Sequence, residues 1–141
     1  VSNSAGERFI TLFIARYNTE TRVLEYINAA HNPPVIINTA TGTSSLLRQS
    51  CVGVGMLDDM PGVNTDYLTL KNPTKIICYT DGLSELKDEG GRDLGISPLV
   101  KHFPNRKPLA ENIDSLIRDI DISSNNLRLF DDVSILAVEI P

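Results

Sequence analysis

The sequence predicts an α+β fold with mainly antiparallel sheets, and three observations support this. Apolar stretches rich in β-branched and aromatic residues recur through the first 80 residues, and another closes the chain. Short polar turns join neighbouring stretches, which favours antiparallel pairing. Helical periodicity is confined to the region after residue 82, and helices grouped after a run of strands are typical of this class. We expect residues 1–141 to form one domain.

Six apolar stretches predict strands, at residues 8–17, 22–28, 35–38, 67–70, 75–80 and 133–140. The first has apolar residues on both alternating faces, so we expect it to be buried on both sides. The polar residues 18–21 connect it to the second strand as a hairpin. The last stretch is almost wholly apolar, which is typical of an inner strand.

Two helices are predicted after most of the strands, preceded by one helical turn at residues 83–86. Ser97 followed by Pro98 has the cap-then-proline pattern of a helix start, and Pro104 ends this short helix. A longer helix begins at Pro108, because five apolar residues fall on one helical face that we expect to pack in the core. These residues are Leu109, Ile113, Leu116, Ile117 and Ile120.

The composition excludes several classes of function. The chain has 13 basic and 18 acidic residues, a net charge of −5, and no basic run, which argues against nucleic acid or anionic lipid as a partner. No apolar run reaches the roughly 20 residues that a membrane-spanning helix needs. Cys51 and Cys78 form no CxxC pair, and we expect free, buried thiols in a reducing cytoplasm. The chain lacks a starting methionine, so we expect it to be part of a longer protein.

Two acidic positions could carry chemistry. Asp81 follows an apolar strand and precedes Gly82, while Asp131 and Asp132 stand just before the last apolar strand. If these two strands pair in antiparallel fashion, the three carboxylates converge at one end of a sheet. No lysine or arginine adjoins them in sequence, so a hard divalent cation such as Mg²⁺ or Mn²⁺ would balance their charge. The alternative is that Asp81 caps a turn and the Asp131–Asp132 pair solvates a strand start.

Five segments in order resemble the bacterial SpoIIE/RsbU-type PP2C-like serine/threonine phosphatases. They are Arg8-Phe9-Ile10-Thr11-Leu12, Ala29-Ala30-His31-Asn32-Pro33-Pro34, Tyr79-Thr80-Asp81-Gly82-Leu83-Ser84-Glu85, Leu94-Gly95 and Asp131-Asp132-Val133-Ser134. No single segment is specific for this family, but the occurrence of all five in the family's order is strong evidence for the resemblance. The resemblance implies an α-β-β-α sandwich with mainly antiparallel sheets and a site for two Mn²⁺ or Mg²⁺ ions. In such a site the metals activate a water that attacks a phosphoserine or phosphothreonine ester.

The resemblance also assigns roles to residues. Asp81 and Asp131 fall on catalytic metal-ligand positions. Gly82 and Asp132 belong to the same metal set, in which Asp132 fits a supporting role. Glu85 recurs in the family's Thr-Asp-Gly-x-x-Glu pattern, where a role behind the metal ligands and plain solvation remain open. His31, like Glu85, is predicted to lie behind the metal ligands. It also invites a role as a general acid, but its flanking prolines favour a loop histidine that is hydrogen-bonded to backbone.

The departures from the family pattern concern an earlier part of the domain. An Asp-containing strand and a Gly-Asp-x-x-Gly-His-Gly segment, which supply further metal aspartates in the family, are absent from these 141 residues. The chain therefore resembles the C-terminal portion of the domain, and alone we expect it to bind metal weakly and to turn over poorly. Missing strands would leave open sheet edges and an uncovered apolar face, which predicts a homodimer or strand exchange.

Three functions remain open from the sequence. The first is a Mg²⁺- or Mn²⁺-dependent phosphoprotein phosphatase, whose substrate, by resemblance, would be a phosphorylated STAS-type anti-sigma-factor antagonist or a similar signalling protein. The second is a non-catalytic phosphatase-like module that binds a signalling partner. The third is a small cation-binding fold unrelated to phosphatases. Aspartate motifs in the natural sequence before Val1 would favour the enzyme.

Overall fold

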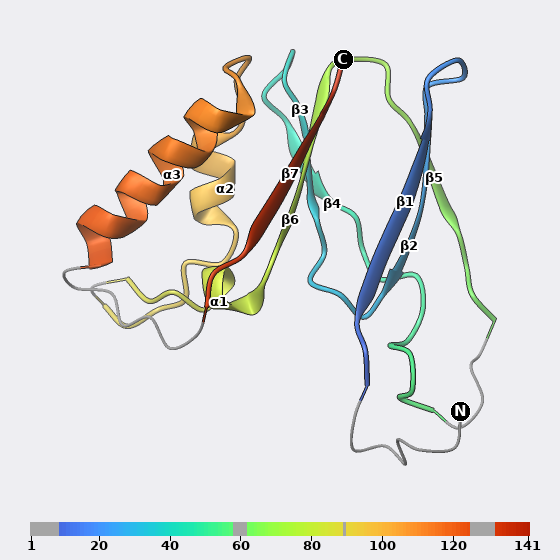
Figure 1. The fold of residues 1–141 in the computed structure, drawn as a ribbon, viewed down its shortest axis with the longest axis horizontal. Coiled ribbons are helices and arrows are strands. Elements are labelled where there is room, and N and C mark those ends of the chain that lie inside the picture. The colour runs from blue at the N-terminus through green and yellow to red at the C-terminus, as the bar shows by residue number, and fades with distance from the viewer. Residues whose placement is uncertain (1–8, 58–61, 89, 125–131) are drawn as a thin grey trace. The chain divides into compact units, whose positions relative to one another are not determined.

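The computed structural model describes residues 9–57, 62–88, 90–124 and 132–141. These residues form an α+β structure with two antiparallel sheets, which confirms the predicted class (Figure 1). They divide into two compact units, the first made of Val1–Pro33 and Leu47–Lys71 and the second of Pro34–Leu46 and Asn72–Pro141. Among the described residues, no helix has the length and apolar character to cross a membrane.

The first unit contains a three-stranded sheet in the order β1-β2-β5. Its strands are β1 (Leu12–Asn18), β2 (Val23–Ala29) and β5 (Asp66–Thr69). β1 and β2 form the predicted hairpin, and the Asn18 side chain closes its turn by accepting the N–H groups of Glu20 and Thr21 at 2.9 and 3.0 Å. The hairpin prediction was confirmed because polar turn residues and alternating apolar residues carry local information.

The prediction that residues 8–17 are buried on both faces is wrong. β1 lies at an edge of its sheet, and its side chains are mostly exposed, including Leu12 and Ile14, the latter 55% exposed. An apolar pattern shows what a strand could bury, whereas burial also needs an element that covers it. The described residues leave much of β1 uncovered.

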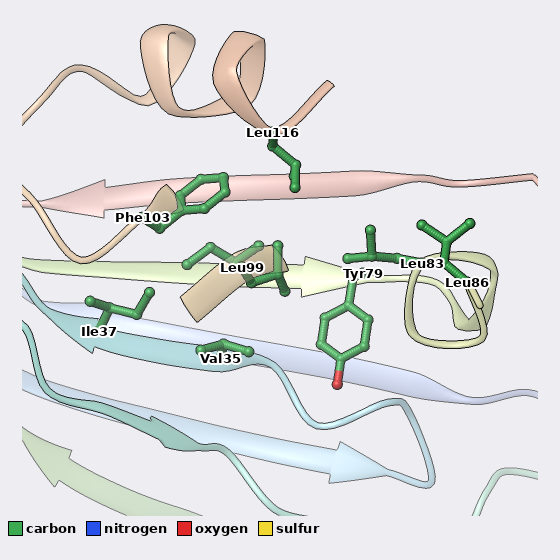
Figure 2. Close-up of a cluster of buried hydrophobic side chains, with 9 residues drawn as sticks. Val35, Ile37, Tyr79, Leu83, Leu86, Leu99, Phe103 and Leu116 are labelled. Carbon is green, nitrogen blue, oxygen red and sulfur yellow. The ribbon is translucent and has the colours of Figure 1, made fainter. Parts of the chain in front are cut away.

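The second unit contains a four-stranded sheet in the order β4-β3-β6-β7, with three helices. The strands are β3 (Val35–Asn38), β4 (Ser44–Leu46), β6 (Thr74–Tyr79) and β7 (Ile135–Ile140), and the helices are α1 (Asp81–Ser84), α2 (Ser97–His102) and α3 (Leu109–Ser124). Helices α2 and α3 lie on one side of the sheet (Figure 1). The buried core of this unit is formed by side chains of the sheet and of the helices, and Figure 2 shows it. It consists of Val35, Ile37, Ile77, Tyr79, Leu83, Leu86, Leu99, Phe103 and Leu116.

β7 corrects the expectation of an inner strand at residues 133–140. Among the described strands it pairs with β6 alone, and so it forms an edge of the sheet as described. Ile135 and Ala137 pack against the core, whereas Leu136 and Val138, on the opposite face, are 64% and 48% exposed. The apolar run therefore marks a strand with two apolar faces, of which the described chain covers one.

Helix α3 confirms the helix predicted from Pro108, and α2 confirms the short helix near Pro98, each with one correction. Ile117 is 49% exposed, so the apolar face of α3 is narrower than predicted. The N-cap of α2 is Ile96, and Ser97 is already inside the helix, where its hydroxyl makes no cap hydrogen bond. Pro98 still falls in the first turn, where its missing N–H costs nothing.

A fully buried lysine connects the sheet to the helices. Lys75, in β6, is 0% exposed, and its ammonium group donates to the carbonyl oxygens of Asn105 and Lys107 and to Asn112 Oδ1, at 3.0, 2.7 and 2.6 Å. Asn112 donates in turn to the His102 carbonyl oxygen at 2.9 Å. The three N–H groups of the ammonium are thus all satisfied. Nothing in the sequence around Lys75 had indicated burial.

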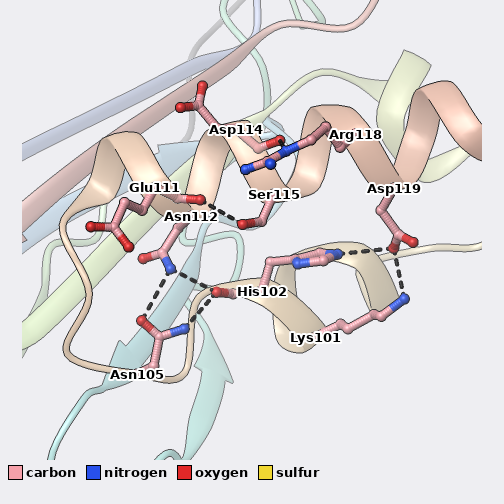
Figure 3. A network of polar contacts seen from close by, with 9 residues as sticks. All are labelled: Lys101, His102, Asn105, Glu111, Asn112, Asp114, Ser115, Arg118 and Asp119. Carbon is pink, nitrogen blue, oxygen red and sulfur yellow. Dashed lines mark hydrogen bonds and ion pairs between the residues drawn. The ribbon is translucent and has the colours of Figure 1, made fainter.

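A second polar cluster joins α2 to α3 (Figure 3). Asp119 of α3 accepts Lys101 Nζ at 2.8 Å and His102 Nε2 at 2.9 Å. The His102 side chain is only 15% exposed, so this ion pair is partly shielded from solvent. The hydrogen bonds from Lys101 and then His102 lower the pKa of the Asp119 carboxyl group below its ordinary value.

Asp119→Asn is expected to lower the free energy of unfolding by about 0.5–1 kcal/mol at pH 7, because the partly exposed pair contributes modestly. A lowered folded-state pKa means that this stabilisation is present above the ordinary carboxyl pKa of 3.8 and disappears as the pH falls through the folded value. Urea unfolding at pH 7 measures the loss of stability, and the same measurement at pH 3 shows how much of that loss disappears when the carboxyl group is protonated. Asp114→Asn, on an exposed position of the same helix, is the control, and an equal loss in both variants would contradict the prediction.

Candidate functional site

The end of β6 lies beside the start of β7, as the antiparallel pairing rule predicts. The last register pair of the ladder is Tyr79 with Ile135. Asp81 stands two residues after Tyr79, and Asp132 stands three residues before Ile135. The predicted strand pairing is therefore confirmed, and it brings the chain segments that carry Asp81 and Asp132 to the same end of the four-stranded sheet.

Thr80 links these two segments. Its N–H donates to the Ser134 carbonyl oxygen at 3.1 Å, its hydroxyl donates to the Asp132 carbonyl oxygen at 3.2 Å, and the Ser134 N–H donates to the same hydroxyl oxygen at 2.9 Å. In the sequence, Thr80 is a short hydroxyl residue between a strand and an Asp-Gly step, within the Thr-Asp-Gly pattern, and nothing there indicates its contact with residues 132–134.

Asp81 begins the short helix α1, which the core holds in place. Leu83 and Leu86 are 0% and 1% exposed, so α1 is anchored by apolar burial. The Asp81 carbonyl oxygen accepts the Glu85 N–H at 2.8 Å, and Asp81 Oδ1 accepts the N–H of the buried Gly82 at 3.2 Å. The Asp81 side chain itself is exposed, so its remaining carboxylate lone pairs face solvent.

The acidic residues of the loop after α1 form ion pairs with basic residues of the same loop. Asp93 forms an ion pair with Lys87, and Asp88 forms one with Arg92 at 2.9 Å. Hydrogen bonds from Arg92, first from its backbone, lower the pKa of the Asp88 carboxyl group. Among the described residues, no lysine or arginine forms an ion pair with Asp81. Within the described part of the chain, Asp81 is therefore an exposed carboxylate without an ion pair, and it could accept an external cation.

The structure describes only some of the other predicted site residues. Asp131 lies outside the described residues. Asp132 is exposed at the start of the segment that Thr80 holds, and Glu85 is exposed at the C-cap of α1. In the part of the chain that the structure describes, no three His, Cys, Asp or Glu side chains gather closely enough to hold a metal ion. A two-metal site thus stays a prediction.

His31 belongs to the first unit, where its loop is hydrogen-bonded to backbone as expected. Its Nδ1 donates to the Asn32 carbonyl oxygen at 2.7 Å, and its N–H donates to Oδ1 of the buried Asn28 at 2.9 Å. Ala30 adopts a φ of +55°, a left-handed conformation that costs a non-glycine residue about 1–2 kcal/mol. These contacts give His31 a structural role, and a role behind the metal ligands stays a prediction.

The two cysteines are free thiols, as predicted, although only Cys51 is fully buried. Burial raises the pKa of the half-buried Cys78 thiol, which keeps it protonated and poorly nucleophilic at neutral pH. The candidate site therefore offers oxygen donors, with Asp81 as an open carboxylate and Asp132 beside it. Such a donor set fits hard cations such as Mg²⁺ and Mn²⁺ better than zinc.

The first unit has a shallow pocket of about 230 Å³ between residues of β1 and β2 and Thr65. Two of its lining residues, Arg16 and Glu25, are hydrogen-bonded to each other at 2.5 Å. Because its charged groups are already paired, this pocket offers less for phosphate or metal chemistry than the end of β6.

Solved structures with the same fold define the class of protein. The SiaA-PP2C domain of Pseudomonas aeruginosa superposes with a TM-score of 0.75 over 93% of this chain and 52% of its own, at 17% identity. The phosphatase domain of SpoIIE from Bacillus subtilis matches with a TM-score of 0.63 over 92% of this chain and 58% of its own, at 15% identity. The fold is thus that of part of a PP2C-like phosphatase domain.

The family follows from the sequence. The family described as Stage II sporulation protein E (SpoIIE) matches residues 1–141, and the chain belongs to this family. Protein IcfG from Synechocystis is 30% identical over 135 residues, which are 92% of this chain and 20% of that protein. The chain therefore spans a fifth of this curated relative and about half of the solved structures just described.

Proposed function

We propose that this chain carries part of the active site of a Mn²⁺- or Mg²⁺-dependent protein serine/threonine phosphatase. The observation that carries the proposal is the meeting of Asp81 and Asp132 at one end of the β6–β7 pair, with Thr80 between them. Membership in the SpoIIE family supports it, as does the description of one fold neighbour, RsbX, as a complex with magnesium.

The residues that would hold the metals are Asp81, Gly82, Asp131 and Asp132. With divalent ions bound there, these residues would gain the Lewis acidity needed to activate a water and to neutralise charge on the phosphoryl oxygens. The protein's own part is to present the exposed Asp81 carboxylate on a helix anchored by Leu83, and to hold the backbone of Asp132 beside it. A preorganised array of charges of this kind stabilises a phosphoryl-transfer transition state mainly by positioning and electrostatics.

The proposed substrate is a phosphoserine or phosphothreonine on a bacterial signalling protein, of the STAS-type anti-sigma-factor antagonist class, in the cytoplasm. One fold neighbour supports this class: it is described as the RsbU and RsbW domains of Rv1364c from Mycobacterium tuberculosis, joined in one protein. The thiol of Cys78 takes no part, since hydrolysis by water needs no phosphoenzyme. The 141-residue chain by itself is expected to turn over poorly.

The test is phosphate release from a phosphoserine peptide by the natural full-length protein with Mn²⁺, with Mg²⁺ and with EDTA. We expect hydrolysis that needs the metal and returns when Mn²⁺ replaces the EDTA. Metal-independent hydrolysis would refute the mechanism. Binding of the phosphoprotein without any hydrolysis would instead support a non-catalytic interaction module.

A further inference from the structure

The hydroxyl group of Thr80 both donates to and accepts from a segment more than 50 residues away in the sequence. It donates to the Asp132 carbonyl oxygen at 3.2 Å and accepts the Ser134 N–H at 2.9 Å. The regular β6–β7 ladder ends at Tyr79 and Ile135. Beyond the last backbone pair of the ladder, hydrogen bonds of the Thr80 side chain therefore connect the end of β6 to the backbone of Asp132 and Ser134.

Thr80 makes this link instead of a local bond that its position favours. It is the N-cap residue of α1, with extended φ and ψ of −87° and 162°, where a threonine hydroxyl commonly accepts an N–H of the first turn. No such cap bond is formed. Its absence shows that the hydroxyl is oriented toward residues 132–134 rather than toward its own helix.

We propose that Thr80 is a positioning residue, whose hydroxyl fixes the backbone of Asp132 beside Asp81 and thereby sets the affinity of this end of the sheet for a divalent cation. The effect on metal affinity rests on the proposed function, whereas the effect on the backbone of Asp132 does not. Thr80 itself supplies no metal ligand in this account. It acts through the Asp132–Ser134 segment, whose backbone would lose two hydrogen bonds if the hydroxyl were removed.

The experiment compares Thr80→Val and Thr80→Ser in the natural full-length protein. Valine keeps the shape of threonine without the hydroxyl, whereas serine keeps the hydroxyl. Calorimetric titration with Mn²⁺ is expected to show about tenfold weaker binding for Thr80→Val and a change of less than about threefold for Thr80→Ser. Thr69→Val, at an exposed strand position in the first unit, is the control and should bind Mn²⁺ like the unmodified protein.

A second readout needs no metal. Hydrogen exchange of the Ser134 amide in the metal-free protein should be at least about tenfold faster in Thr80→Val and nearly unchanged in Thr80→Ser. Unchanged exchange in Thr80→Val, or equal loss of Mn²⁺ affinity in both variants, would overturn the proposal. If the unmodified protein binds no Mn²⁺, the proposed function and the metal-binding part of this proposal both fail. The exchange rates then still decide whether Thr80 holds the segment.

Discussion

Lys75→Met is expected to lower the free energy of unfolding by about 3 kcal/mol, the largest loss of stability among the variants considered. The substitution keeps most of the length and the apolar character of the side chain but removes all three donors. Three acceptors then lose their partner: the carbonyl oxygens of Asn105 and Lys107, which are partly buried at this contact, and the side chain of the buried Asn112. A buried acceptor left unsatisfied costs about 1–3 kcal/mol, and water can replace part of what the two carbonyl oxygens lose.

The pH dependence of this loss has a defined sign. Burial lowers the pKa of Lys75 below its usual 10.5, so the folded protein holds this proton less tightly than the unfolded chain does. Stability due to Lys75 therefore rises as the pH increases from the folded-state pKa toward 10.5 and is constant below it. Urea unfolding at pH 7, 9 and 10 should show a gap between the unmodified protein and Lys75→Met that widens at alkaline pH.

The matched control is Lys71→Met, at an exposed position before β6. It should change the free energy of unfolding by less than about 0.5 kcal/mol at every pH. A loss in Lys75→Met no larger than in Lys71→Met would mean that the buried network adds nothing to stability. A gap that narrows toward pH 10 would contradict the direction of the Lys75 pKa.

Asp81→Asn is expected to abolish most of the metal-dependent activity of the full-length protein, reducing phosphate release at least about a hundredfold. Asparagine retains one oxygen donor at this position but removes the negative charge that a divalent cation requires. The fold should be unaffected, because the Asp81 side chain is exposed and its one described bond, to the N–H of Gly82, can be made by an amide oxygen. Phosphate release and urea unfolding, measured together, separate the two effects.

Asp114→Asn is the control for this substitution, since it removes one exposed carboxylate from α3 and leaves the end of β6 unchanged. Its activity should stay within about twofold of the unmodified protein, in line with the near-neutral effect of most surface changes. If Asp81→Asn kept full Mn²⁺-dependent turnover, the carboxylate at the end of β6 would have no place in the mechanism.

Much of the fold could be predicted from local patterns. The β1–β2 hairpin, the strand β6 and the helix α3 each appear within a few residues of their predicted positions, because turn residues and periodicity are local signals. Burial was predicted less well. The exposed side chains of β1 and the edge position of β7 depend on which elements cover and flank a strand, and no periodicity within the strand carries that information.

Only the part of the site that depends on strand pairing could be predicted from the sequence. The pairing of β6 with β7 followed from a general rule of antiparallel sheets, so the approach of Asp81 and Asp132 could be expected. The Thr80 link and the Lys75 network could not, because each joins residues at least 30 positions apart through specific side-chain atoms. A lysine in an apolar strand and a threonine before Asp-Gly look ordinary until their distant partners are known.

Asp81 and the acidic residues before β7 are proposed to hold the divalent cation of a phosphatase. Anomalous diffraction at the manganese edge, from crystals of the natural full-length protein grown with Mn²⁺, would locate that cation. We expect manganese within ligand distance of the Asp81 carboxylate, about 2–2.5 Å, and next to the segment that contains Asp131 and Asp132. Manganese bound in an active protein with none beside Asp81 would show that this carboxylate is not a metal ligand.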